Sequence, residues 1–261
     1  MNDRTNQWWE PVDLAVGQIL RCTIGPLVLT LGRGEGDWRL AWDRQAQGDD
    51  ARTLLREVTD GPFPGEQFER FISHRDGGTV RLEPRLADRP LVVRPRQPTF
   101  LPGGEETTFF ISSPLWIAIE IGGRVLREIP VLELSDTWFG PSTREGEICY
   151  AMPTYARVAL GDVPLRHHRA VTPVRIHNRA SEPLPIEKLS LPVPVLAIHG
   201  CEDGQLWTQG VSLERKVEGD MAELRVDAGP PREAREPRLL SAARREPERG
   251  GLVRAFSGLF Q

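Results

Sequence analysis

The sequence predicts an all-β protein, a β-sandwich of the immunoglobulin-like or jelly-roll-like kind, and three observations support this. Its 261 residues include 25 glycines and 23 prolines, which interrupt helices but are common in β-turns. Turn signals recur roughly every 8–12 residues, a spacing typical of sandwiches. The short segments between these turns often alternate apolar and polar residues, as strands with one buried face do.

The first predicted region, residues 1–83, is a smaller β unit that either stands alone or shares the core of the next region. Its expected strands cover residues 18–24, 27–32, 37–42 and 79–82. The loop GRGEG at 32–36 superficially resembles a phosphate-binding loop, but it lacks the GxxxxGK[ST] pattern and precedes a strand. It is therefore predicted to be a hairpin turn. The polar segment 45–58 is assigned to a short helix or a loop.

The second region, residues 84–228, has the most regular pattern and is predicted to form the sandwich itself. Its expected strands cover residues 91–94, 107–112, 115–121, 125–134, 146–150, 155–160, 171–178, 186–189, 195–199, 206–216 and 221–226. The segment 115–121 is the most apolar of these and is therefore expected to be central. Pro183, Pro185, Pro192 and Pro194 fit edge strands or short connections, because proline cannot donate a ladder hydrogen bond.

The third region, residues 229–261, is predicted to be a linker and an amphipathic C-terminal tail. Residues 229–250 are rich in proline, arginine and glutamate, which is typical of a linker. The tail GLVRAFSGLFQ follows. Its apolar residues fall on one face of a short helix: Leu252, Val253, Phe256, Leu259 and Phe260. Because a helix this short is marginal in water, we expect it to pack against a partner, a membrane surface or its own chain.

No catalytic, cofactor-binding or metal-binding motif is recognisable. His167, His168 and His177 are close in sequence, but adjacent strand residues point to opposite faces and no acidic or cysteine partner stands at ligand spacing. We therefore interpret these histidines as exposed or loop residues. Cys149 lies in an apolar strand and is predicted to be a core residue. The sequence thus indicates no cofactor and no metal, and it favours a protein that is not an enzyme.

Charge and cysteine content limit the compartment and the partners. The net charge is −4 and the body of the chain has no basic cluster, so a nucleic-acid partner is not expected. Three cysteines without a CxxC pair fit a reducing compartment. The polar N-terminus does not resemble a signal peptide, and no apolar run approaches the ~20 residues that span a bilayer. We expect a cytoplasmic protein whose contact with a membrane, if any, is peripheral and made by the tail.

The segment 135–150 holds the most distinctive group of side chains in the body of the chain. Asp136 and Arg144 flank the aromatic pair Trp138 and Phe139, which precedes a Gly-Pro turn. Aromatic residues beside such a turn can line a binding surface. The alternative is that both rings close the end of the sandwich core. These four residues are the candidate binding surface.

Four segments together resemble an uncharacterised family of all-β proteins that is found in archaea and bacteria. They are IGPLVLTLGRGEGDWRLAW at 24–42, RPLVVRP at 89–95, TWFGPSTREGEICYA at 137–151, and VTPVRIHNRASEPLPIEKLSLPVPVLAI at 171–198. The resemblance covers residues 14–228 and consists of turn and strand signatures. It implies a shared β fold and an association with mechanosensitive channels, and it supplies no site residues.

We therefore hypothesise a non-enzymatic interaction or regulatory module that acts through a β surface, with the tail as docking element. Its partner is expected to be another protein, with a membrane protein such as a mechanosensitive channel as one candidate. The alternatives are a sandwich that binds a small molecule or carbohydrate at Trp138 and Phe139, and an enzyme without familiar motifs.

Overall fold

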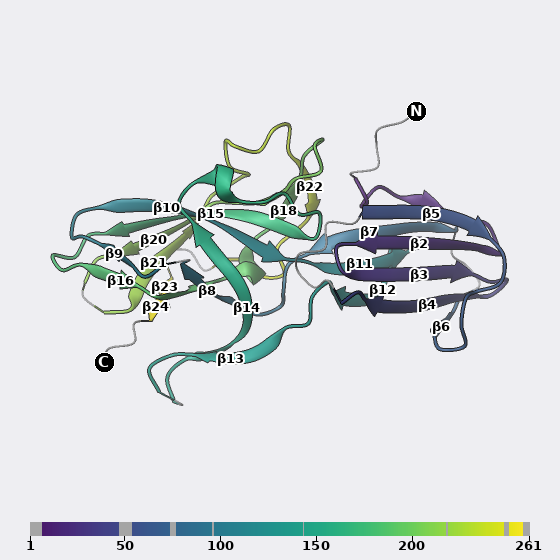
Figure 1. Ribbon diagram of the computed structural model, residues 1–261, viewed down its shortest axis with the longest axis horizontal. Helices are drawn as coiled ribbons and strands as arrows, with labels where there is room; N and C mark the ends of the chain where they lie inside the picture. Colours follow the sequence, from purple (N-terminus) through teal and green to yellow (C-terminus); the bar gives the residue numbers. More distant parts are fainter. Residues whose placement is uncertain are drawn as a thin grey trace.

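Strands make up nearly all the regular structure of the protein, which confirms the all-β prediction. The computed structural model describes residues 7–46, 54–73, 77–95, 97–142, 144–217, 219–247 and 251–257, without the side chains of 152–155 and 257. Helical structure in these residues is limited to the 3-10 turns η3 (Leu160–Asp162) and η4 (Val193–Val195). The strands form two lobes that lie side by side in Figure 1.

The first lobe contains a five-stranded antiparallel sheet in the order β5-β2-β3-β4-β6. Its strands are β2 (Gln18–Ile24), β3 (Leu27–Arg33), β4 (Asp37–Arg44), β5 (Leu54–Asp60) and β6 (Glu69–Ile72). The hairpin predicted at the GRGEG loop is confirmed, because β3 pairs with β4 across it. Of the polar segment 45–58, residues 54–58 are strand rather than helix or loop, since they belong to edge strand β5 on β2, and residues 47–53 lie outside the described residues.

A second antiparallel sheet, in the order β1-β7-β11-β12, completes the first lobe. Its strands are β1 (Val12–Asp13), β7 (Thr79–Arg85), β11 (Trp116–Ile121) and β12 (Arg124–Pro130). Leucines and isoleucines of both sheets belong to one buried cluster. The pairing of β11 with β7 brings residues 116–130 into this lobe, while residues 86–115 cross to the other lobe and back. The lobes therefore do not divide the chain at a single point.

In the second lobe, one sheet closes on itself through eight strand positions. Going around, they are β10 (Glu106–Pro114), β15 (Arg169–Asn178), β20 (Val211–Arg215), β21 (Met221–Val226), then β23 (Leu252–Arg254) with β24 (Phe256–Ser257), β17 (Lys188–Leu191), β8 (Leu91–Pro95) and β14 (Glu147–Arg157). The contacts of β15 with β20 and of β14 with β8 are parallel. This closure leaves the strands of the ring few open edges.

The remaining strands extend this lobe. β18 (Ile198–Gly200) pairs with β19 (Leu206–Thr208), which joins β15, and with β22 (Arg238–Ser241). β9 (Thr99–Leu101) pairs with β16 (Leu184–Ile186), and β13 (Ser135–Phe139) pairs with β14. The expected linker at 229–250 therefore contains an ordered strand, β22, that adds to the sheet.

The prediction of a C-terminal amphipathic helix is wrong. Residues 252–257 are extended and form β23 and β24, which pair with β21 and β17. Phe256 is buried, whereas Leu252 is 66% exposed. The backbone groups of the tail form hydrogen bonds with the open edges of β17 and β21. A short helix is only marginally stable in water, so this strand pairing is the more stable arrangement of the tail. Val253 is partly buried, and Leu259 and Phe260, the last two residues of the predicted apolar face, lie outside the described residues.

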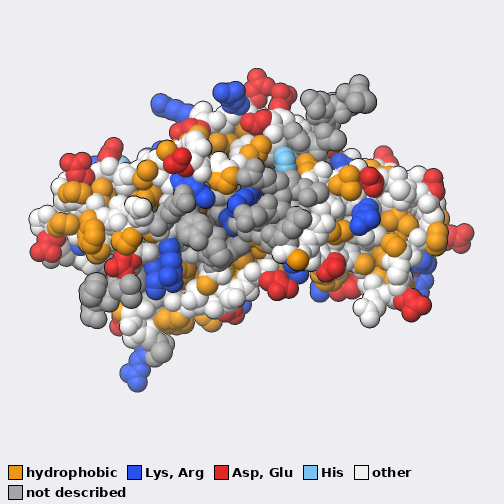
Figure 2. Space-filling model, viewed as in Figure 1, with side chains coloured by type: hydrophobic (Ala, Val, Ile, Leu, Met, Phe, Trp, Pro, Cys, Tyr) orange, Lys and Arg blue, Asp and Glu red, His pale blue; other side chains and the backbone are white. Residues whose placement is uncertain are grey.

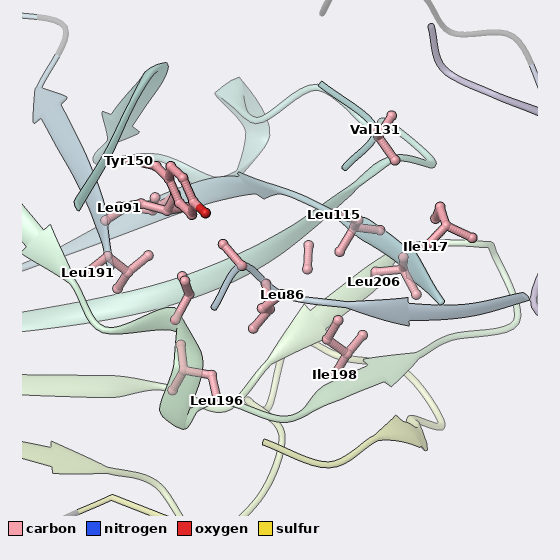
Figure 3. Packing of buried hydrophobic residues seen from close by; sticks show 14 of the residues in the cluster. Leu86, Leu91, Leu115, Ile117, Val131, Tyr150, Leu191, Leu196, Ile198 and Leu206 are labelled. Atoms are coloured by element: carbon pink, nitrogen blue, oxygen red, sulfur yellow. The ribbon is translucent and has the colours of Figure 1, made fainter. Parts of the chain in front are cut away.

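The two lobes share one continuous hydrophobic core. Figure 3 shows Leu86, Leu115 and Ile117 beside Ile198 and Leu206 where the lobes meet, and these residues belong to the largest buried cluster. Polar groups tie the same junction together. Arg85 and Arg244 bind the two carboxylate oxygens of Glu128, each at 2.6 Å. The lobes are therefore joined by apolar packing and by a partly buried ion-pair network.

The N-terminal tryptophans also belong to this junction. Trp8 and Trp9 are buried, with their ring centroids 5.7 Å apart in an edge-to-face arrangement. The Trp8 indole N–H donates a hydrogen bond of 3.0 Å to the backbone oxygen of His167. Residues at the start of the chain thus close the contact with the second lobe.

Candidate functional site

The segment 135–151, the candidate surface of the sequence, forms a two-stranded antiparallel ribbon. β13 pairs with the first part of β14, so that Trp138 lies opposite Ile148 and Asp136 lies opposite Tyr150. The ribbon projects below the second lobe in Figure 1, where β13 is the free outer strand. Hydrophobic side chains are visible along this lower edge in Figure 2. We call this element the β13–β14 ribbon.

The two faces of the β13–β14 ribbon have opposite environments. On the inner face Phe139 and Cys149 form a small buried cluster with Val92 of β8. On the outer face Trp138 is 44% exposed and its cross-strand partner Ile148 is 51% exposed. Because side chains alternate along a strand, anchoring the inner face necessarily presents the outer pair to solvent.

The tip of the ribbon holds Trp138 in one orientation. The indole N–H of Trp138 donates a hydrogen bond of 2.7 Å to the backbone oxygen of Ser142. A Cβ at Gly146 would lie 2.8 Å from that indole nitrogen and 2.5 Å from the Phe139 oxygen, so only glycine fits there. The Ser142 hydroxyl accepts bonds from the backbone N–H groups of Arg144 and Glu145. The exposed ring is therefore ordered before any partner binds.

The base of the outer face is a charged and aromatic cluster. Arg89 binds Asp136 at 3.0 Å and its guanidinium lies 5.3 Å from the centre of the Tyr150 ring. The Tyr150 hydroxyl donates a 2.9 Å hydrogen bond to Asp88. Burial, together with this hydrogen bond, raises the pKa of Tyr150, while the anionic forms of Tyr150 and Asp136 raise the pKa of Arg89. Tyr150 thus stays a neutral donor and Arg89 a cation across the physiological range.

The structure separates the four predicted surface residues into different roles. Trp138 and Asp136 lie on the outer face, Phe139 is buried beneath it, and Arg144 is an exposed residue of the tip loop. The ion-pair partner of Asp136 is Arg89. Of the aromatic pair, Phe139 is therefore buried in a small cluster of its own, and Trp138 is exposed to solvent.

Sequence reasoning missed Ile148, Arg89 and Tyr150 as members of this surface. A signal for Ile148 was present, because a turn over residues 140–146 places it directly opposite Trp138. No local signal pointed to Arg89, which lies 47 positions before Asp136. Only the parallel pairing of β8 with β14 brings these segments together.

The histidines and cysteines of the described residues are the other candidates for chemistry. Among the described residues, no three or more His, Cys, Asp or Glu side chains are arranged to hold a metal ion. His168 lies in a turn, as one of the two interpretations had it, but it is buried, whereas His177 is half-buried on strand β15 and so is neither exposed nor in a loop. Cys149 is fully buried, as predicted, and burial raises its pKa to about 12. Cys22 has the same shift, so neither thiol is a nucleophile at neutral pH.

Several clefts lie away from the ribbon. The largest of three has a volume of about 290 Å³ and lies between β7 and β22, where Trp9 and Leu240 meet Arg81 and Arg238. Others of about 200 and 220 Å³ lie beside Phe63 and Phe109. These volumes are at or below the lower end for small-molecule sites, and the three clefts share no residue with the ribbon.

Fold and surface together define a two-lobed all-β protein with an anchored ribbon that presents an ordered tryptophan. The chain belongs to the family described as "Protein of unknown function (DUF432)", whose model matches residues 8–261. This family covers the C-terminal strands, which the sequence resemblance left out. Neither the curated proteins nor the solved structures contain a match. No helix in the part of the chain that the structure describes is long and apolar enough to cross a bilayer.

Proposed function

We propose that this protein is a non-enzymatic interaction module that binds a protein partner through the outer face of the β13–β14 ribbon. The observation that supports the proposal is the exposed cross-strand pair Trp138 and Ile148 on a ribbon whose other face is buried. Tryptophan is enriched among the residues that dominate binding energy, and an ordered ring loses little entropy on binding. The ion pair of Asp136 and Arg89 supplies a polar rim beside the apolar pair.

The partner that we propose first is a membrane-protein assembly such as a mechanosensitive channel, in a cytoplasmic setting. This finer proposal comes from the family association noted above. The ribbon suits such a role because it reaches away from both lobes and can enter a groove without rearrangement of the core. We assign it a regulatory or structural role, since the described outer-face residues are an apolar pair and an ion pair, which are groups that bind a partner.

Photo-crosslinking in cells that express the full chain tests the proposal. A photoreactive phenylalanine analogue replaces Trp138 in one variant and Ile148 in another, with Ile72, an exposed residue of the other lobe, as the matched position. We expect one protein to be captured from both ribbon positions and not from position 72. With that protein purified, Trp138→Ala should weaken binding by about 2 kcal/mol, roughly 30-fold in Kd.

The control for this measurement is Ile72→Ala, which removes an apolar side chain that is more exposed than Trp138, 62% against 44%, and should leave Kd unchanged. A partner that binds the Trp138→Ala and wild-type chains equally well would show that another surface makes the contact. Capture of no protein from either ribbon position would reject the interaction module and favour a site for a small molecule or carbohydrate on the Trp138 ring.

A further inference from the structure

The C-terminal strand closes the ring of strands in the second lobe. β23 pairs with β21 and β24 pairs with β17, with only Ala255 between the two short strands. The Ala255 backbone donates a 2.9 Å hydrogen bond to Asp220 on one side and accepts one of 3.0 Å from Ser190 on the other. Without residues 252–257, β17 and β21 would each present an open edge, and the space that Phe256 fills between them would be empty. We call this space the acceptor groove.

Within residues 251–257, the tail pairs with its neighbouring strands over short lengths. It pairs over three residues with β21 and over two with β17, whereas β10 and β15 pair over nine. Among residues 251–256 of the tail, Phe256 is the one large side chain that is buried, and Leu252 is 66% exposed. Arg254 forms an ion pair with Asp220 and a longer one, 3.8 Å, with Glu145 of the ribbon tip. Short terminal strands with so few anchors open at much lower free energy than the whole fold.

The chain before the tail has its own anchors. The Arg244 side chain donates a 2.7 Å hydrogen bond to the backbone oxygen of Leu86, and the Arg245 backbone donates one of 3.0 Å to Pro194. Opening of the tail therefore leaves the strands ahead of it, including β22, in place.

We propose that the tail is an exchangeable strand and that the acceptor groove takes residues 252–257 of a second copy of this chain. The observation that selects this occupant is the seated tail itself. The groove already provides the open edges of β17 and β21, a buried position for Phe256 and a carboxylate, Asp220, for Arg254. A second copy offers the identical contacts, so two copies that trade tails lose no interaction and gain a two-fold dimer.

A disulfide test on the full chain distinguishes exchange from permanent self-closure. Glu223 of β21 lies opposite Leu252 of β23, close enough on antiparallel strands for a disulfide between cysteines at the two positions. One chain carries Glu223→Cys and a second carries Leu252→Cys. The three native cysteines are buried, so the introduced thiols react first. The two chains are mixed at high concentration, oxidised and separated by size under denaturing conditions.

We expect a covalent heterodimer whose yield rises with concentration. The double variant Glu223→Cys/Leu252→Cys should close its disulfide within one chain when dilute. Val217→Cys, exposed but not opposite the tail, replaces Glu223→Cys as the control for random collision. If the double variant closes its disulfide while the mixed chains yield no more heterodimer than this control, the tail is permanent and the proposal is overturned. Failure of the double variant to close would overturn it as well, because the pairing itself would then be absent.

Substitution of Phe256 provides a second test of strand exchange, because its effect on the heterodimer yield should depend on which of the two chains carries it. Phe256→Ala in the chain that carries Glu223→Cys loosens only the tail that blocks its own groove, and it should raise the heterodimer yield about tenfold. The same change in the chain that carries Leu252→Cys weakens the donated tail and should lower the yield by a similar factor. Equal effects of the two placements would indicate collision rather than strand exchange.

Discussion

Trp138 and Phe139 are neighbours in sequence, yet they have opposite surroundings and different expected contributions. Phe139 is 2% exposed and packs with Cys149 and Val92, whereas Trp138 projects into solvent from the other side of the same strand. The one-residue offset decides this, because the side-chain period of a strand is two. We therefore expect the buried Phe139 to contribute to the stability of the fold and the exposed Trp138 to be available for binding.

This difference in burial predicts that alanine substitutions at the two positions change the free energy of unfolding by different amounts. Phe139→Ala should lower the free energy of unfolding by about 3 kcal/mol, because it empties a buried site. Trp138→Ala should lower it by less than about 1 kcal/mol, since the ring is nearly half exposed and makes one hydrogen bond at the tip. Urea titration followed by circular dichroism measures both. Similar losses for the two variants would mean that the ribbon faces are assigned wrongly.

The β13–β14 ribbon is shaped at the scale of the element by its turn. Gly140 and Gly146 face each other where the strands meet, and a Cβ on Gly140 would lie 2.1 Å from the Glu145 oxygen. Gly146 also has φ +154°, which side-chain-bearing residues rarely adopt. The close approach of these backbones lets the indole of Trp138 reach the Ser142 oxygen. The geometry of this turn therefore determines how the Trp138 ring is oriented on the outer face of the ribbon.

Gly146→Ala should accordingly disorder the ribbon tip and cost about 1–3 kcal/mol in stability. We expect the Trp138 amide and its neighbours to exchange hydrogen faster, while the strands of the first lobe keep their protection. Gly161→Ala is the matched control, because a Cβ there meets no atom within 4 Å. An unchanged exchange rate at the tip would mean that the ring does not depend on this turn.

At the scale of the whole molecule, the two lobes are expected to unfold together. The largest hydrophobic cluster includes residues of both lobes, and Glu128 of the first lobe binds Arg244 of the C-terminal segment. His167 and His199 lie in the second lobe near this junction. Burial lowers the pKa of both below the ordinary value of 6.5, with the neighbouring His168 adding to the effect for His167.

These two shifts predict a loss of stability on mild acidification. A histidine with a lowered folded pKa is neutral in the folded state, whereas the unfolded chain takes up a proton near pH 6.5. Stability is therefore full above pH 6.5 and falls as the pH drops through and below that value. The urea midpoint should decrease between pH 7.5 and 5.5, before carboxylates titrate. His199→Gln should reduce this decrease, and an identical pH profile would exclude His199 as a source.

Much of the local structure follows from the sequence. Strand periodicity and Gly-Pro turns located β2, β3, β4, β11 and β15 within a few residues. The sequence also singled out the segment around Trp138, because an aromatic pair beside a Gly-Pro turn is a local signal. Arg89 and Tyr150 could not be added to that surface from sequence, since pairing between distant strands brings them together.

What the sequence by itself determined is the β class, the turns and the absence of a familiar reaction motif. Those properties depend on residues a few positions apart, where propensity and period act directly. The tertiary structure alone decided that residues 116–130 join the first lobe and that the tail is a strand. For the tail the reason is physical: its apolar spacing fits a helix, but two open strand edges satisfy its backbone and bury Phe256. Such edges exist only once the other strands have folded around them.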